Sequence, residues 1–178
     1  MFNVSIVKGL RHLLYLALAL VGMLGAAACT GGYSFTGASI PAEAKTISIT
    51  QFPNNASTVN PQLSQKIYDG LQQMFSSQTS LNVIGDDGDL QISGEITDYT
   101  TRASSIGSDD NVATNRFTIT IKVRFTNRFD SKADFEQSFS RFKDYAASRD
   151  FSSVEQGLTE EIVTELCEDI FNKSVVNW

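Results

Sequence analysis

Histidine is almost absent from this chain of 178 residues, which has one histidine and two cysteines. The single histidine, His12, lies in an N-terminal segment that reads as a removable export signal. Without histidine, the exported chain lacks the base of Ser-His-Asp and Cys-His mechanisms and the commonest zinc ligand. We therefore predict that the protein is not an enzyme, and that it has no catalytic residue, no metal site and no cofactor.

Basic residues and long apolar runs are also scarce. The chain has 14 Lys and Arg against 20 Asp and Glu, a formal net charge of −6. Because nucleic acid selects for a basic surface, this balance argues against a nucleic-acid partner. The longest apolar run, residues 13–24, is shorter than the ~20 residues that span a bilayer. A hydrophobic fraction of 42% still suits one domain with a modest core.

The N-terminus has the pattern of an export signal. Lys8 and Arg11 precede the apolar run without any acidic residue, and the small residues 25–28 lead into Cys29. This ending resembles a bacterial lipobox, which implies cleavage before Cys29 and acylation of that residue. The alternative is an ordinary signal peptide that is cleaved after Ala28. Removing residues 1–28 leaves 12 basic and 20 acidic side chains, a net charge of −8.

The remaining chain divides into a tether and one domain. Residues 29–41 comprise the lipidated cysteine and a Gly- and Ser-rich tether, and residues 42–178 form a single domain. Periodicity predicts strands over 45–52, 81–84, 90–101, 115–128 and 133–145, and helices over 60–78 and from 152 nearly to 178. The order β-α-β-β-β-β-α predicts an α+β fold, with two helices packed on one face of a small, mainly antiparallel four- to five-stranded sheet.

Local patterns add finer expectations. Residues 85–89 (GDDGD) favour a hairpin turn, and residues 102–114 form a polar connection. Ser152 and Glu155 match a capping box at the start of the last helix. Cys167 falls on the apolar side of that helix and is expected to be buried and inert. The acidic residues of the same helix are expected to form a solvated face: Glu160, Glu161, Glu165, Glu168 and Asp169.

The clearest period in the sequence lies in residues 115–128. Apolar residues alternate there with basic residues and threonines, and the basic positions are Arg116, Lys122, Arg124 and Arg128. If both helices cover the apolar side, these four cations lie on the uncovered face of the sheet. They would then be able to donate charge-assisted hydrogen bonds to phosphates. The alternative is that they pair across strands with acids such as Glu136 or Glu95.

Several segments resemble one known family. They are GYSFTGASIP and KTISITQFPNNASTVNPQLSQ near the start of the domain, FTITIKVRFTNRFD and FEQSFSRFKDY in the middle, and SSVEQ and EDIFNKSVVNW near the end. Together they are similar to the Bacteroidetes-type lipopolysaccharide-assembly lipoproteins of the LptE family, over nearly all of residues 32–178. The resemblance implies two helices on a small mixed sheet and no catalytic activity.

The resemblance also implies location and partners. Members of the family are anchored in the outer membrane and act as a plug inside the barrel protein LptD, in the last step of lipopolysaccharide transport. Expected partners are therefore an LptD-like barrel, lipopolysaccharide and the outer membrane. Residues 30–34 carry no acidic run of the kind found on surface-exported lipoproteins, which favours a periplasm-facing anchor with the domain in the barrel lumen. In enterobacterial members basic residues bind lipopolysaccharide; Arg116, Lys122, Arg124 and Arg128 are assigned that role here on charge placement alone.

Two other classes stay open at this stage. A structural lipoprotein of another envelope complex would share the signal, the tether and the fold. A secreted enzyme would need a pair of carboxylates in a pocket, whereas the acids of this sequence fall in turns or on an exposed helix face.

Overall fold

The computed structural model describes residues 40–105 and 113–175. Within them the elements follow the predicted order, and they are β1 (Thr46–Ile49), α2 (Leu63–Gln78), β2 (Asn82–Ile84), β3 (Leu90–Ser105), β4 (Thr114–Asn127), β5 (Phe135–Ala146) and α3 (Phe151–Val175). A short 3-10 helix, η2 (Ser131–Ala133), joins β4 to β5. The predicted α+β class is confirmed. The predicted signal peptide, Cys29 and nearly all of the tether lie outside the described residues.

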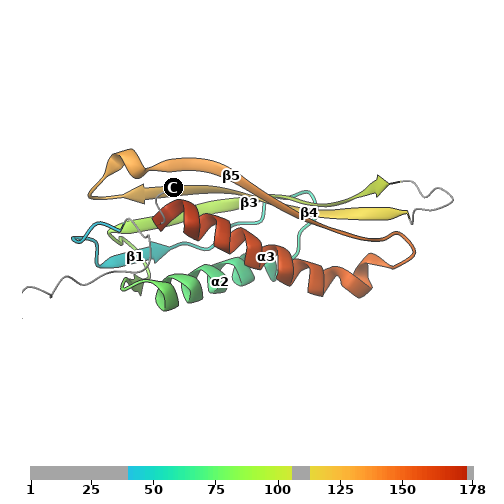
Figure 1. The fold of residues 1–178 in the computed structure, drawn as a ribbon, viewed down its shortest axis with the longest axis horizontal. Coiled ribbons are helices and arrows are strands. Elements are labelled where there is room, and N and C mark those ends of the chain that lie inside the picture. The colour runs from blue at the N-terminus through green and yellow to red at the C-terminus, as the bar shows by residue number, and fades with distance from the viewer. Residues whose placement is uncertain (1–39, 106–112, 176–178) are drawn as a thin grey trace, which may run out of the picture. The chain divides into compact units, whose positions relative to one another are not determined.

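The five strands form one mixed sheet in the order β2-β1-β3-β4-β5. β1 pairs in parallel with β2 on one side and with β3 on the other. The three longest strands, β3, β4 and β5, form two antiparallel ladders. Both helices lie on the same side of this sheet (Figure 1). The opposite side, here called the open face, is not covered by a helix in the described part of the chain.

The connection from β2 to β3 corrects the expected hairpin turn at residues 85–89. β2 and β3 flank β1 and both run parallel to it, so the connection has to cross β1. A Cβ atom on Gly88 would lie 2.4 Å from the Ser48 backbone nitrogen, which explains the glycine at the crossing. The Gly88 N–H donates to Ser48 Oγ at 3.1 Å, and Asp87 adopts a left-handed φ of 52°. The Asp-Gly pair thus serves a crossover between parallel strands.

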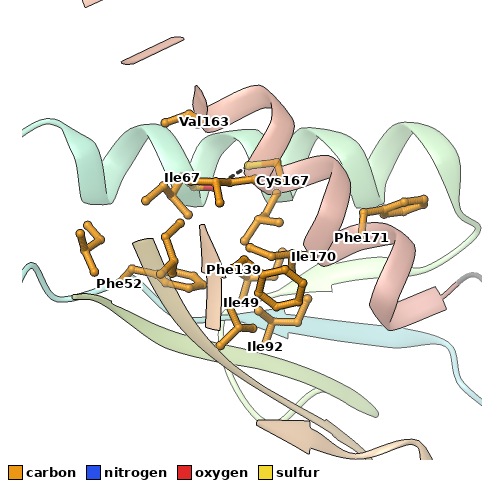
Figure 2. Close-up of a cluster of buried hydrophobic side chains, with 14 of the residues drawn as sticks. Ile49, Phe52, Ile67, Ile92, Phe139, Val163, Cys167, Ile170 and Phe171 are labelled. Carbon is orange, nitrogen blue, oxygen red and sulfur yellow. Dashed lines mark hydrogen bonds between the residues drawn. The ribbon is translucent and has the colours of Figure 1, made fainter. Parts of the chain in front are cut away.

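Alternation along the strands places the core between the sheet and the helices. In β4 every second residue is buried, as the sequence predicts, and these residues are Phe117, Ile119, Ile121, Val123 and Phe125. In β3 a bulge between Ile96 and Asp98 shifts the phase, so Ile92, Ile96 and Tyr99 all face inward. Figure 2 shows side chains of both helices packed against this apolar face.

The two helices pack closely where a glycine of α2 faces a cysteine of α3. A Cβ atom on Gly70 in α2 would lie 2.9 Å from Cys167 Sγ in α3. The Cys167 thiol points towards α2 and contacts the Ile67 carbonyl oxygen at 3.8 Å (Figure 2). Burial raises the pKa of Cys167 to about 12. The prediction of a buried cysteine is confirmed, and a thiol with such a pKa is poorly nucleophilic at neutral pH.

The start of α3 differs from the expected capping box. The helix begins at Phe151, so Ser152 lies inside its first turn, and the Ser153 N–H donates to the Asp150 carbonyl at 3.0 Å. The Glu155 carboxylate instead accepts a hydrogen bond of 2.5 Å from the Tyr99 hydroxyl on β3. Glu155 therefore connects α3 to the sheet and does not cap the start of the helix.

The acidic side of α3 is solvated as expected at Glu160, Glu161 and Glu168, which are exposed, but four of its five acids also form ion pairs. Arg141 of β5 makes two hydrogen bonds of 2.6 Å to Asp169. Lys143 of β5 pairs with two further acids of α3, Glu161 at 3.1 Å and Glu165 at 2.7 Å. Lys66 of α2 pairs with Glu160 at 3.1 Å. These ion pairs connect α3 to β5 and α2 along its edges.

The predicted polar connection of residues 102–114 is shorter than expected. Residues 102–105 belong to β3 and residue 114 begins β4. Residues 106–112 lie outside the described residues.

Candidate ligand-binding surface on the open face

The four cations predicted for binding follow the polar side of β4. Residues spaced by two on a strand share a face, so Arg116, Lys122 and Arg124 lie on the open face. Arg128 comes directly after the end of β4. The register of the antiparallel ladders places carboxylates beside three of these cations, in the pairs Arg116↔Asp144, Lys122↔Glu95 and Arg124↔Glu136. The open face is therefore of mixed charge, which corrects the expectation that the cations stand together there in a segregated group.

Lys122 and Arg124 converge on one carboxylate. Lys122 Nζ lies 2.6 Å from Glu136 Oε1, and Arg124 donates to Glu136 Oε2 from Nη2 at 2.7 Å and from Nε at 3.0 Å. Hydrogen bonds from Lys122 and then from Arg124 lower the pKa of Glu136 to about 2. The same contact raises the pKa of Lys122. At neutral pH, two cations thus share one fully ionised carboxylate.

These three side chains line a depression of ≈ 330 Å³ in the open face. The other lining residues are Pro53, Ser93, Gly94, Glu95 and Val123. The depression therefore draws on three adjacent strands, β3, β4 and β5, and on the segment that follows β1. Its rim offers an ammonium, a guanidinium and the Ser93 hydroxyl as donors, which suits an anion with several oxygens.

The segment after β1 supports the depression from beneath. The Ile96 N–H donates to the Pro53 carbonyl at 2.9 Å, so this segment runs along β3. The Phe52 side chain is fully buried, and a Cβ atom on Gly94 would lie 2.5 Å from its ring. Glycine at position 94 lets the aromatic ring lie directly against the β3 backbone. The Asn55 side chain donates to Glu95 at 2.7 Å and holds that carboxylate on the rim.

Arg116 lies apart from the depression, near the other end of β4. Its guanidinium makes two hydrogen bonds to Asp144, at 2.8 and 2.9 Å, and lies 3.6 Å from the centre of the Phe142 ring. The bidentate contact raises the pKa of Arg116 and lowers the pKa of Asp144. Phe142 is 48% exposed, so this end of the open face combines a cation with an apolar ring.

Arg128 contacts the crossover of the parallel strands. It lies 2.7 Å from Asp87 Oδ1 and 3.6 Å from Asp89 Oδ1. Backbone N–H groups of Lys45 and Thr46 also donate to Asp89, and the first of these is the main reason that the pKa of Asp89 is lowered. Arg128 therefore braces the 85–89 connection and does not reach the depression.

The structure thus brings together two of the four predicted cations. Pairing with acids, which the sequence left as the alternative to phosphate binding, is present for Arg116, Lys122 and Arg124. The assignment of the four residues to phosphate binding stays a prediction.

Two further properties concern only residues 40–105 and 113–175. Nowhere in these ranges do three or more His, Cys, Asp or Glu side chains gather in a way that could hold a metal ion. Neither of the described helices is long and apolar enough to cross a membrane.

The family model of lipopolysaccharide-assembly proteins named LptE matches residues 44–174. This stretch is most of the chain and nearly all of the described domain. The chain belongs to the LptE family. The family acts in assembly and not in catalysis, and the match leaves the Bacteroidetes-type subdivision as a prediction. A search of curated proteins finds no match.

Solved structures with a similar fold include bacterial envelope proteins. A homologue of a neuraminyllactose-binding hemagglutinin from Helicobacter pylori aligns with a TM-score of 0.50 and 10% identity, covering 79% of this chain and 88% of that one. A minor lipoprotein from Acinetobacter baumannii aligns with a TM-score of 0.49 and 12% identity, covering 73% of this chain and 91% of that one. Lipoprotein B from Nitrosomonas europaea aligns with a TM-score of 0.47 and 13% identity, covering 71% of this chain and 79% of that one. Of these three, the first reaches a TM-score of 0.5, and at 10% identity its likeness to this LptE-family chain concerns the fold alone.

The sequence did not point to two residues of the candidate surface of this LptE-family domain, Ser93 and Phe142. Ser93 lines the depression and Phe142 stacks on Arg116, whereas Glu95 was considered only as an ion-pair partner. Phe142 did carry a signal, because it falls out of phase with Phe135 and Phe139 in β5. Ser93 had no signal of its own, since only the β3–β4 register brings it beside Arg124.

Proposed function

We propose that the protein is an outer-membrane lipoprotein that works as plug and assembly partner of an LptD-like barrel during lipopolysaccharide transport. The observation that carries this proposal is the LptE family match over residues 44–174. Lipopolysaccharide is a phosphorylated lipid, and its insertion into the outer leaflet requires binding and release, without any change of covalent bonds. A small domain with an exposed pair of cations suits this binding and release.

The proposed contact with lipopolysaccharide is the depression on the open face. Lys122 and Arg124 supply convergent charged donors there, with side chains 45% and 65% exposed. Charge-assisted hydrogen bonds from such donors are the usual means of holding a phosphate. Arg116 beside the exposed Phe142 is a second contact in this proposal, because an amphiphile presents both phosphate and acyl chains. Arg128 keeps its assignment to phosphate binding as a separate contact, since it lies outside the depression and pairs with Asp87 and Asp89 at the crossover.

Affinity capture tests the partnership with the barrel. The full chain, tagged near its C-terminus, is purified from outer membranes of its native bacterium in mild detergent, and the bound proteins are identified by mass spectrometry. We expect an LptD-like barrel in near-stoichiometric amount. Recovery of a different envelope complex in its place would favour the alternative of a structural lipoprotein of that complex.

Charge reversal tests the contact with lipopolysaccharide. We expect Lys122→Glu with Arg124→Glu to weaken binding of purified lipopolysaccharide at least tenfold, because two attractive contacts become repulsive. A matched control reverses two cations elsewhere, Lys66 on α2 and Lys132 in η2, with the same change in net charge. Equal loss in both double variants would show that only total charge matters and would remove the depression from the proposal.

Acyl labelling tests the anchor. Cells that express the wild-type chain or Cys29→Ala are grown with a radiolabelled fatty acid. Label in the wild-type protein and none in the variant is expected if Cys29 is acylated. Equal label in both would refute lipidation at this residue.

A further inference from the structure

Glu136 occupies the position of an anion in the depression. Both of its carboxylate oxygens are engaged, one by Lys122 Nζ at 2.6 Å and the other by two nitrogens of Arg124 at 2.7 and 3.0 Å. A carboxylate held in this way resembles a bound oxyanion more than a simple cross-strand partner, because donors from two residues converge on it. The same donors would be required by any phosphate that entered the depression.

The contacts of Glu136 are exposed and therefore exchangeable. Its side chain is 39% exposed and lies on the edge strand β5, which pairs with β4 on one side only. Ion pairs at such exposed positions contribute little net stability, since water can solvate both partners when they separate. Opening these contacts therefore costs the fold little.

The ion pair at Arg116 provides a contrast on the same face. Its guanidinium donates two hydrogen bonds to one carboxylate, that of Asp144, and stacks on the Phe142 ring at 3.6 Å. Asp144 contacts only that one cation among the described residues, and neither residue lines the depression. Among the carboxylates of residues 40–105 and 113–175, Glu136 is the one that pairs with two cations and also lines a hollow with room for a ligand.

We infer that Glu136 is an internal competitor that fills the Lys122–Arg124 site in the free protein and must be displaced by the phosphate group of a bound lipid. This inference rests on the proposed function and adds a selectivity device to it. A phosphate monoester carries between one and two negative charges and three acceptor oxygens, so it can outcompete a carboxylate with one charge. An amphiphile without such a group cannot. Glu136 thereby determines how much negative charge a ligand needs before it can replace the carboxylate at Lys122 and Arg124.

The decisive variant is Glu136→Gln, which keeps the size of the side chain and removes its charge. The full chain in nonionic detergent is titrated with fluorescent diphosphorylated lipid A and with its monophosphoryl form. We expect the variant to bind diphosphorylated lipid A about two- to fivefold more tightly than the wild type does, the size expected when a pair of exposed ionic contacts no longer competes. The gain should shrink at about 0.5 M salt because ions screen the exposed charges.

The matched control is Glu160→Gln on the helix side of the domain. Glu160 is also exposed and ion-paired, to Lys66 at 3.1 Å, and its removal changes the net charge equally. We expect no change in affinity for this variant. A gain equal to that of Glu136→Gln would assign the effect to total charge and would overturn the inference.

Different results would contradict the competitor role of Glu136 and the contact of Lys122 and Arg124 with lipopolysaccharide. If Glu136→Gln binds lipid A no more tightly than the wild type, while reversal of Lys122 and Arg124 weakens binding, the competitor role is wrong and the proposed contact stands. If that double reversal leaves lipid A binding unchanged, the proposed contact itself is wrong. Inorganic phosphate is the competing probe, and displacement of lipid A by low-millimolar phosphate would assign the site to the free ion and overturn the lipid assignment.

Discussion

Gly94 illustrates how one residue without a side chain shapes the candidate surface. A Cβ atom at this position would lie 2.4 Å from the Lys122 carbonyl oxygen and 2.5 Å from the Phe52 ring. Gly94→Ala should therefore destabilise the domain by about 1–3 kcal/mol, the usual cost of overpacking. The matched control is Gly157→Ala, because nothing lies within 4 Å of a Cβ atom there. In mid-helix this change should stabilise by about 0.5–1 kcal/mol. Urea unfolding measures both, and equal effects would contradict the close contact at Gly94.

Glu136 also gives the stability of the fold a dependence on pH, which is small because its ion pairs are exposed. Its pKa falls from an ordinary 4.5 to about 2 in the folded protein, because Lys122 and Arg124 favour the ionised form. A group with a depressed folded pKa stabilises the protein above its unfolded pKa, and that contribution is lost as the pH falls. We expect the loss between about pH 4.5 and 2, and a shallower decline in this window for Glu136→Gln. Urea unfolding at several pH values checks this; parallel curves for the variant and the wild type would contradict it.

At the scale of elements, a polar cluster fastens α3 to β3 and to the segment before α2. The Tyr99 hydroxyl donates to Glu155 at 2.5 Å and accepts from the Asn60 side chain at 3.1 Å. Thr159 Oγ1 lies 3.5 Å from the same hydroxyl. This cluster joins three parts of the chain that are distant in sequence.

Removing the central hydroxyl should loosen these contacts. Tyr99→Phe is expected to lower the free energy of unfolding by about 1–2 kcal/mol, because polar partners lose a hydrogen bond in a largely buried setting. The control is Tyr145→Phe, since the hydroxyl of Tyr145 makes no hydrogen bond within the described part of the chain. Thermal or urea unfolding compares the two variants. A loss for Tyr145→Phe as large as that for Tyr99→Phe would contradict the role of the cluster.

Elements with an unbroken period were predictable from the sequence, and elements that change phase were not. β4 alternates without interruption from Phe117 to Asn127, and its buried apolar positions match the prediction. In β3 the bulge after Ile96 turns Tyr99 inward, and no local sequence pattern predicts the position of that bulge. The path of residues 85–89 could not be predicted from local sequence either. An Asp-Gly pair favours a turn, but whether the turn makes a hairpin or a crossover depends on which strands pair.

The candidate surface was predictable in part for the same reason. Lys122 and Arg124 could be assigned to the open face because the β4 period fixes which side each residue faces. The position of Glu136 opposite Arg124 and of Glu95 opposite Lys122 depends on the registers of two ladders, and the hollow between them also needs the Pro53 segment. These are tertiary features, so the sequence could offer acid pairing only as an alternative.

At the scale of the whole molecule, the acidic balance of the chain does not make every surface repel anionic lipid. Without the predicted signal, residues 1–28, the chain has a net charge of −8, and several acids lie on α3, where Arg141, Lys143 and Lys66 neutralise some of them. The cations of the depression are shared with a single exposed carboxylate. Phosphate binding on the open face is therefore compatible with the net charge, provided that the ligand displaces that carboxylate.

The most direct test of the central claim is depletion of the protein in its native bacterium. Newly made lipopolysaccharide is pulse-labelled, and the fraction that reaches the cell surface is measured against the total. We predict that depletion lowers the surface fraction severalfold while synthesis continues, and that the wild-type chain restores it. A surface fraction that stays unchanged after complete depletion would contradict a role in lipopolysaccharide assembly.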